Sequence, residues 1–188
     1  NQIAPLLKQV DFRDPRAAEQ LLRNMSADPV SARLLVRCHP YLAYALDRTA
    51  SPDRALLGMD RLLHQSADVD ATIEFVAEDP RLLRTVLPIM GASQLLTDIL
   101  VREPEQVRRL LDLDGLSRPK GAAQLKAEAQ ERIKAQPSVP AADGLRRWQD
   151  QEMLRIGSCD LLGMLDLGRV TLELSRLADI LIELCLGL

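Results

Sequence analysis

The sequence predicts an all-α protein, built as an irregular bundle of short helical hairpins followed by a longer antiparallel helix pair. Aromatic residues make up only 3% of the chain, whereas Leu and Ala recur throughout. This mixture favours helices, because sheets are enriched in aromatic and β-branched side chains. With 47% hydrophobic and 27% charged residues, the chain is too apolar to remain disordered, so we expect it to bury a core.

A polar residue followed by Pro recurs in the first half of the chain and predicts where helices begin. Pro loses no hydrogen bond at the first helical position, and a preceding Asp or Ser can accept hydrogen bonds from first-turn amides. Apolar residues then follow at helical spacing, as at Leu83, Val86 and Leu87. We therefore expect a helix to start at each pair: Asp14-Pro15, Asp28-Pro29, His39-Pro40, Ser51-Pro52, Asp79-Pro80 and Glu103-Pro104. Their irregular spacing does not support a solenoid of fixed period.

Breaks in the helical pattern divide the chain into three predicted parts. Residues 1–112 are expected to form an N-terminal helical subdomain, in which Gly91 can close one helix and Ser93 can cap the next. Residues 113–144 are expected to be linkers around one exposed helix, whose apolar stripe is limited to Leu125, Ala129 and Ile133. Residues 145–188 carry two strong helices, which we expect to pair antiparallel through a short turn.

The final helix, from about 169 to 186, is apolar on more than one side. Its main stripe is expected to hold Val170, Leu174, Leu177, Ala178, Leu181 and Leu184, with Leu172, Ile180, Ile182 and Leu186 off that stripe. One antiparallel neighbour covers only one stripe of a helix. We therefore expect an exposed apolar patch near the C-terminus. The chain also begins without Met and ends in an apolar run, so we expect it to be a piece of a longer protein.

Charge and composition exclude several kinds of partner. The net charge is -3 and the pI is about 5.5, which provides no basic field for phosphates, and the few aromatic residues provide no stacking platform for bases. We therefore predict no nucleic-acid partner. The apolar stretches are interrupted by charge, as by Asp179 and Glu183 in the last one, so we predict no membrane span. Cys38, Cys159 and Cys185 are too widely spaced for a disulfide framework or metal clamp and predict reduced, mostly buried thiols in a cytoplasmic protein.

No complete catalytic, cofactor or metal site can be assembled from the sequence. His39 and His64 are the only histidines, and neither has a second ligand at helical spacing, so we interpret them as an N-cap-like and a helix-end residue. Asp68 and Asp70 form a D-x-D pair, which could bind Mg²⁺. Because the pair lies just before a helix and not on a strand, capping is the favoured interpretation. The sequence thus predicts a protein that positions or contacts something.

The most informative segment runs from Leu145 to Leu186. Its first part carries Leu145, Arg146, Trp148, Met153, Arg155 and Ile156; a turn follows with Asp160, Leu161 and Gly163, and a helix with Leu174, Ser175, Leu177, Ala178 and Asp179. In order and spacing this resembles the helical segment ahead of the first catalytic domain in the bifunctional glutamine synthetase adenylyltransferase/adenylyl-removing enzyme family. The segment from Met90 to Leu111 is similar to a second family segment, which extends the resemblance back to about Asp79.

The resemblance implies a parent enzyme that transfers AMP from ATP to a tyrosine of glutamine synthetase and removes it by phosphorolysis, under nitrogen-status control. ATP and Mg²⁺ would serve the parent enzyme, whose first nucleotidyltransferase domain would begin just beyond the last helix. No cofactor would bind this chain, which would be a non-catalytic scaffold. Its partners would be that adjoining domain and glutamine synthetase. The alternative is a free-standing all-α protein-interaction module unrelated to nucleotidyl transfer.

Interface candidates follow from the matching segment. These are Arg146, Arg147, Trp148, Glu152, Met153, Arg155, Asp160, Ser175 and Asp179. We expect Trp148 to anchor the packing of the last two helices. By spacing alone, Arg146, Arg147 and Arg155 could equally form a solvated face with Glu152. The family pattern has several basic residues after its aromatic position, where this chain has 149–151 Gln-Asp-Gln, which leaves open a divergent relative with a different substrate.

Overall fold

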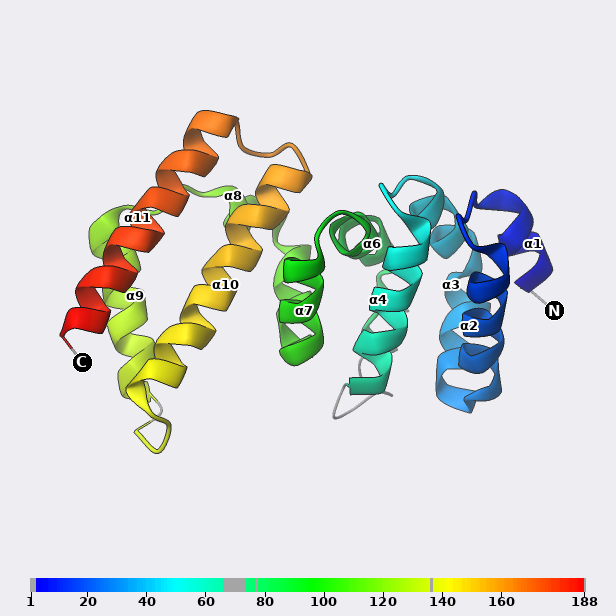
Figure 1. The fold of residues 1–188 in the computed structure, drawn as a ribbon, viewed down its shortest axis with the longest axis horizontal. Coiled ribbons are helices and arrows are strands. Elements are labelled where there is room, and N and C mark those ends of the chain that lie inside the picture. Colours follow the sequence, from blue (N-terminus) through cyan, green and yellow to red (C-terminus); the bar gives the residue numbers. More distant parts are fainter. Residues whose placement is uncertain (1–2, 66–73, 77, 136, 188) are drawn as a thin grey trace. The chain divides into compact units, whose positions relative to one another are not determined.

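The computed structural model describes residues 3–65, 74–76, 78–135 and 137–187, and the described chain is built of helices and the loops that join them (Figure 1). No strand occurs in these ranges, so the prediction of an all-α fold is confirmed. The chain divides into two compact units, Asn1–Leu111 and Asp112–Leu188. Within the described ranges, no helix has both the length and the apolar character needed to cross a membrane.

The first unit is a set of short helices. They are α1 (Ile3–Gln9), α2 (Pro15–Ala27), α3 (Pro29–Asp47), α4 (Pro52–Gln65), η1 (Pro80–Leu82), α6 (Leu83–Ala92), α7 (Gln94–Arg102) and η2 (Pro104–Leu111). The apolar helix α6 packs against both α3 and α4, and α4 also contacts α2 and α7. Leu and Met side chains from these helices form the core, among them Met25, Leu46, Leu56 and Leu87.

Most of the polar-Pro pairs start helices as predicted. α2, α3 and α4 begin at Pro15, Pro29 and Pro52, and the two 3₁₀ helices begin at Pro80 and Pro104. At the start of α2, a carboxylate oxygen of Asp14 accepts a hydrogen bond from the backbone N–H of Ala17 at 3.0 Å. The prediction is therefore confirmed at these five junctions. A polar residue before the Pro is favoured there because the first-turn amides have no partner within their own helix.

The prediction of a helix start at His39-Pro40 is wrong, because Pro40 lies inside α3. An internal Pro removes one backbone hydrogen bond and costs about 3 kcal/mol. Cys38 on one side of Pro40 and Leu42 on the other are both fully buried, so core packing on both sides keeps the helix continuous. His39 therefore lies in the middle of a helix and is not N-cap-like. His64 is in the last turn of α4, as predicted.

The break at 91–93 ends one helix and starts another, although Gly91 has a different role from the one predicted. Ser93 caps α7 by accepting a hydrogen bond from the N–H of Leu96 at 3.3 Å, as expected. Gly91 is buried within α6, and a Cβ at this position would come within 2.9 Å of the Thr49 side chain. Its lack of a side chain thus allows α6 to approach the loop between α3 and α4.

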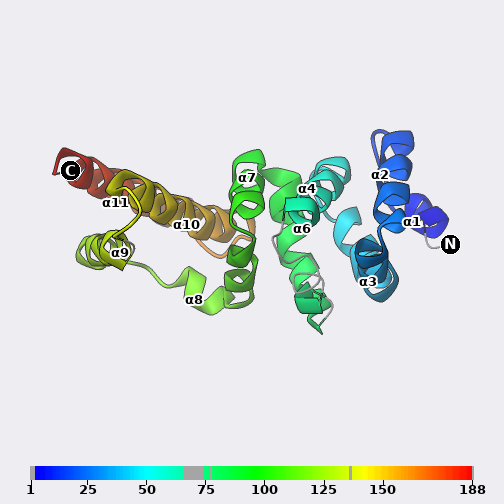
Figure 2. The ribbon, with the colours of Figure 1, turned by 90° about the horizontal axis from the view of Figure 1, so that it is seen from below.

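The second unit is formed by α8 (Leu113–Ser117), α9 (Ala122–Ala135), α10 (Ala141–Leu161) and α11 (Leu167–Leu186). The long helices α10 and α11 run antiparallel (Figure 1), and α9 contacts both of them (Figure 2). Their core comprises Leu125, Ala129, Leu145, Trp148, Ile156, Cys159, Leu165, Val170, Leu177 and Ile180. The apolar stripe of α9 is buried at Leu125 and Ala129 and partly buried at Ile133, as expected.

The predicted stripe of α11 was partly wrong. Val170 and Leu177 are buried as expected, but Leu174 and Ala178 are exposed, whereas Ile180, expected off the stripe, is buried. The buried face instead follows Val170, Glu173, Leu177 and Ile180. The helix is rotated from the expected orientation because Glu173, a charged residue, lies inside the unit.

Two of the three cysteines, Cys38 and Cys159, are buried, while Cys185 is exposed. Asp68 and Asp70, the D-x-D pair of the sequence, lie outside the described residues.

Candidate functional site

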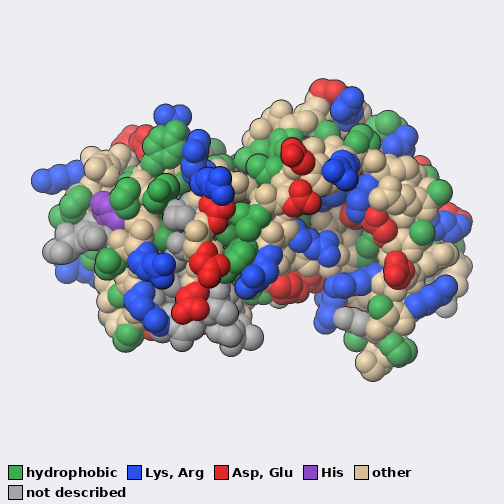
Figure 3. All heavy atoms as spheres, turned by 180° about the vertical axis from the view of Figure 1, so that it is seen from behind, with side chains coloured by type: hydrophobic (Ala, Val, Ile, Leu, Met, Phe, Trp, Pro, Cys, Tyr) green, Lys and Arg blue, Asp and Glu red, His purple; other side chains and the backbone are tan. Residues whose placement is uncertain are grey.

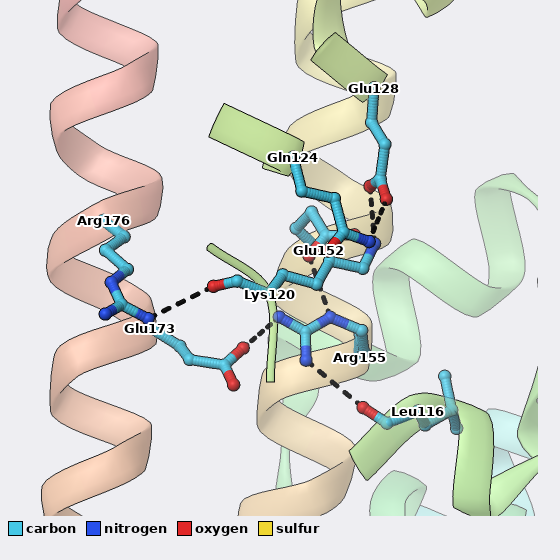
Figure 4. A network of polar contacts seen from close by, with 8 residues as sticks. All are labelled: Leu116, Lys120, Gln124, Glu128, Glu152, Arg155, Glu173 and Arg176. Carbon is cyan, nitrogen blue, oxygen red and sulfur yellow. Dashed lines mark hydrogen bonds and ion pairs between the residues drawn. The ribbon is translucent and has the colours of Figure 1, made fainter. Parts of the chain in front are cut away.

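A buried cluster of charged side chains joins the four helices of the second unit (Figure 4). At its centre are Glu152 and Arg155 of α10, which lie three positions apart and therefore share a face of the helix. Each is only 4% exposed. Arg155 Nε donates to Glu152 Oε2 at 2.8 Å, Nη1 donates to the carbonyl oxygen of Leu116 at 3.2 Å, and Nη2 donates to Glu173 of α11. One guanidinium thus binds α8, α10 and α11.

Lys120, in the segment before α9, extends the cluster. Its Nζ donates to Glu152 Oε1 at 2.7 Å and to Glu128 Oε2 at 2.6 Å. The backbone carbonyl of Lys120 accepts from Arg176 of α11 at 3.2 Å, and Gln124 donates to Glu128 at 2.9 Å. The loop between α8 and α9 is therefore tied to both long helices through this lysine. We call Lys120, Glu128, Glu152, Arg155 and Glu173 the ion cluster.

Two members of the ion cluster, Arg155 and Glu128, have pKa values shifted in favour of the charged form. Burial opposes the charge on Arg155, but Glu152 and Glu173 outweigh that effect and raise the pKa of the guanidinium further above its ordinary value. Burial likewise opposes the ionisation of Glu128. Hydrogen bonds from Lys120 and Gln124 outweigh it, so the pKa of Glu128 is held below its usual range. Each of the three carboxylates is engaged by Arg155 or Lys120, although Glu173 Oε1 is buried without a hydrogen-bond partner among the described residues.

This arrangement fits a structural role. A general acid or base must be free to exchange a proton with a substrate, whereas Glu152 and Glu173 are held by Arg155 in the interior of the unit. Across the described ranges, there is no group of three or more His, Cys, Asp or Glu side chains that could hold a metal ion. The described residues thus do not form a site that fits Mg²⁺.

The structure separates the interface candidates into three groups. Glu152 and Arg155 lie in the ion cluster. The solvated-face interpretation is wrong for these two residues, because both side chains are buried. Trp148 is 3% exposed within the core, and Met153 packs against that core. The remaining candidates lie at or near the surface: Arg146, Arg147, Asp160, Ser175 and Asp179.

Hydrogen bonds explain three of the surface candidates locally. Arg146 forms a 3.4 Å ion pair with Asp150, one turn further along α10. Ser175 Oγ donates to the carbonyl oxygen of Thr171 at 2.9 Å. At Asp160 the contact is made by the backbone: its carbonyl oxygen accepts from the N–H of Gly163 at 3.0 Å, while the side chain is exposed.

The Asp160-to-Gly163 turn ends α10 in a manner that only Gly satisfies readily. Gly163 has a φ of +67°, in the left-handed region. The N–H of Met164 donates to the carbonyl of Cys159 at 2.8 Å, which completes a Schellman motif together with the Gly163 bond. Asp166 then caps α11 by accepting from the N–H of Arg169 at 2.9 Å. This part of the sequence pattern therefore fixes the antiparallel return of α11.

Sequence reasoning missed Lys120, Glu128, Glu173 and Arg176. Glu173 had a detectable signal, since it lies three positions after Val170 and four before Leu177, on the same helical face. A carboxylate at such a position predicts a buried cation. Lys120 lies in an irregular loop, and no local pattern indicates that it binds Glu152, 32 residues away.

The outer face of α11 is a second candidate, for contact with a partner. Opposite the buried face, α11 exposes Leu167, Leu172, Ile182 and Leu186, of which Ile182 is 61% and Leu186 85% exposed. Ser175, Ala178 and Asp179 lie on this side as well and are exposed. The expected exposed apolar patch is therefore present, although Ile180 is not part of it.

A family model and several known proteins match the sequence of this chain. A family model described as glutamate-ammonia ligase adenylyltransferase matches residues 83–188, which include the whole second unit. Proteins named bifunctional glutamine synthetase adenylyltransferase/adenylyl-removing enzyme are similar over most of the chain. The one from Streptomyces avermitilis is 34% identical over 171 residues, 89% of this chain and 16% of the relative. The Thioalkalivibrio sulfidiphilus protein is 28% identical over 97% of this chain and 20% of the relative. The Corynebacterium glutamicum protein is 29% identical over 91% of this chain and 17% of the relative.

Proposed function

Because this chain belongs to the glutamate-ammonia ligase adenylyltransferase family, we propose that it is a helical scaffold and docking region for a nucleotidyltransferase domain of the same protein. The chain spans only about a fifth or less of the length of the relatives named above. Family membership removes the alternative of a module unrelated to these enzymes. The relatives' name specifies glutamine synthetase as their substrate, and we propose that the longer protein modifies the same substrate.

The exposed apolar face of α11 is the observation that carries this proposal. A lone exposed Leu is ordinary, but several large apolar side chains along one helix mark a surface that excludes water in its complete setting. Leu172, Ile182 and Leu186 occupy such a face, and the opposite face of α11 is already filled by the core. The relatives are several times longer than this chain. We propose that the adjoining catalytic domain of the longer protein covers this face of α11.

The ion cluster supports the docking role because it makes α11 rigid. Glu173 and Arg176 fix α11 to Arg155 and to the Lys120 backbone. Charge pairs that satisfy each other in the interior specify one arrangement of helices, because any shift leaves a buried charge without a partner. A helix that is already held in one position loses less conformational entropy on binding a partner than a mobile helix does.

Binding of ATP and Mg²⁺ belongs, in this proposal, to the catalytic domain. Arg155 and Lys120 engage all three carboxylates of the ion cluster, and the described residues bring together no group of three or more metal-ligating side chains. We expect titration calorimetry of the 188-residue chain with ATP and Mg²⁺ to show no saturable heat. Saturable micromolar binding would contradict a purely structural role.

A substitution on α11 tests the docking role directly. Ile182→Asp should change the unfolding free energy of the 188-residue chain by less than about 0.5 kcal/mol, because the side chain is exposed. In the longer protein the same change should lower the melting temperature, because it places a charge in an apolar interface. Leu57→Asp is the matched control, since Leu57 is a 49% exposed apolar residue of α4 and should be tolerated in both proteins. If the longer protein tolerates Ile182→Asp as well as Leu57→Asp, the docking role is wrong.

A further inference from the structure

An exposed stripe of Arg and Tyr runs along α3 in the first unit. Arg37, Tyr41 and Tyr44 of α3, and Arg48 one residue past its end, follow one another at spacings of four, three and four residues, which places them on one side. Tyr41 is 45% and Tyr44 44% exposed, and both arginines are exposed as well. Arg84 joins them from α6, which packs against α3. We call these five residues the Arg–Tyr stripe.

The stripe is ordered by cation–π contacts. The guanidinium carbon of Arg48 lies 4.5 Å from the centroid of the Tyr44 ring, and that of Arg84 lies 5.3 Å from it. Such contacts hold a guanidinium over the ring while leaving its N–H groups able to donate to a carboxylate. Tyr44 therefore orders Arg84 of α6 and Arg48 of the turn after α3, so less side-chain entropy is lost when they bind a ligand.

The positive charge of the stripe is not neutralised by the described part of the chain. Many arginines of this protein pair with carboxylates, as Arg23 does with Glu19, and Arg81 with Asp79. Arg37, Arg48 and Arg84 form no such ion pair with a described residue. In Figure 3, Arg and Lys side chains lie among hydrophobic ones on the surface of the first unit. Against a formal net charge of -3, these exposed cations indicate a surface for a ligand of opposite charge.

We propose that the Arg–Tyr stripe binds an acidic segment of a protein partner, with Asp or Glu carboxylates of that segment on Arg37, Arg48 and Arg84. Tyr and Arg are, together with Trp, the residues enriched at the energetic centres of protein interfaces. Nucleic acid fits less well, because the Tyr44 ring is already contacted by guanidiniums and three arginines provide a short basic track. This surface lies in the first unit and is independent of the docking role proposed for α11.

Fluorescence anisotropy with the whole 188-residue chain tests the proposal. The probe is a fluorescein-labelled oligoglutamate peptide, and an oligoglutamine peptide of equal length is the uncharged control. We expect saturable binding of the glutamate peptide alone, weaker at about 300 mM than at about 50 mM salt because screening increases. The double variant Arg37→Glu/Arg84→Glu should raise the Kd at least about tenfold, since it places like charges against the peptide.

The matched control is Arg16→Glu/Arg23→Glu on α2, which changes the net charge equally at exposed positions and should keep the Kd within about twofold. Tyr44→Ala should weaken binding although it removes no charge, because it releases Arg48 and Arg84. Melting curves establish that each variant is folded. The proposal is overturned if no saturation occurs up to about 1 mM peptide or if both double variants lose binding equally. Tighter binding of a single-stranded RNA than of the glutamate peptide also overturns it.

Discussion

Arg155 of α10 and Glu173 of α11, 18 positions apart in the sequence, meet in an ion pair whose side chains are 5% and 2% exposed. The pair joins the two long helices in the interior of the second unit, whose core is otherwise formed by apolar side chains. Because water is excluded, each charge depends on its partner.

Removing Arg155 should destabilise the protein strongly. Arg155→Met leaves Glu173 buried without its cation and Glu152 with Lys120 alone, at an expected cost of about 3–5 kcal/mol in the free energy of unfolding. The double variant Arg155→Met/Glu173→Leu should recover part of that loss, because it removes the orphaned charge of Glu173. Urea denaturation measures both. The exposed Arg146→Met serves as control, and a loss of less than about 1 kcal/mol for Arg155→Met would contradict the structural role of the cluster.

Trp148 should contribute through packing. Trp148→Ala is expected to cost about 3–5 kcal/mol, because the side chain is buried between α10 and its neighbours. Trp148 Nε1 makes no hydrogen bond to a described residue, so Trp148→Phe, which keeps an aromatic ring but loses the N–H, should cost clearly less. Thermal denaturation of both variants decides the point. Equal losses would show that the indole nitrogen has a partner of its own.

Gly163 should be required for its backbone conformation. Gly163→Ala is expected to cost about 1 kcal/mol, because φ is +67° there and an added Cβ meets no atom within 4 Å. Gly121→Ala is the matched control, since its Cβ also meets nothing and its φ is not positive. That change should be neutral or slightly stabilising. We expect the urea midpoint of Gly163→Ala to lie below that of Gly121→Ala. Equal midpoints would mean that the C-terminus of α10 can form without a left-handed residue.

The three thiols should differ in reactivity. Burial raises the pKa of the Cys38 and Cys159 thiols, which lowers their thiolate fraction and also blocks reagents. Cys185 is exposed. Titration of the folded protein with a thiol reagent should therefore give one rapid phase, equivalent to one thiol, which Cys185→Ser abolishes. A rapid phase that persists in Cys185→Ser would show that the Cys38 or Cys159 region opens readily.

Acid should weaken the Glu128 contacts. The pKa of Glu128 is lower in the folded state than its ordinary value, so its ionised form stabilises the fold above the unfolded-state pKa. That contribution is lost as pH falls through the folded-state pKa. Unfolding free energies of the wild type and Glu128→Gln, compared between about pH 6 and 3, should differ most at the upper end of this range and converge at the lower end. A difference that stays constant with pH would mean that Lys120 does not favour the charged form of Glu128.

Local sequence patterns were sufficient for the fold class and for the helix starts at five of the six polar-Pro pairs, whereas α8 and the first turn of α10 lie in a segment expected to be a linker. Capping and Pro at the first helical position depend on a few adjacent residues, so Asp14-Pro15 and Ser93 were predictable. The same holds for the stop at Gly163 and for the burial of Trp148, which lies on the apolar side of α10. Where long-range packing opposed a local signal, as at Pro40, the prediction was wrong.

Tertiary structure alone decided which charges are buried. The sequence shows that Glu152 and Arg155 share a helical face, but whether that face meets water depends on Lys120 and Glu173, which come from other helices. The same contact turns Glu173 inward and leaves Leu174 exposed, and so determines which apolar side chains of α11 remain for a partner. Helical periodicity is a property of one segment, whereas the free energy of a buried charge depends on every segment around it.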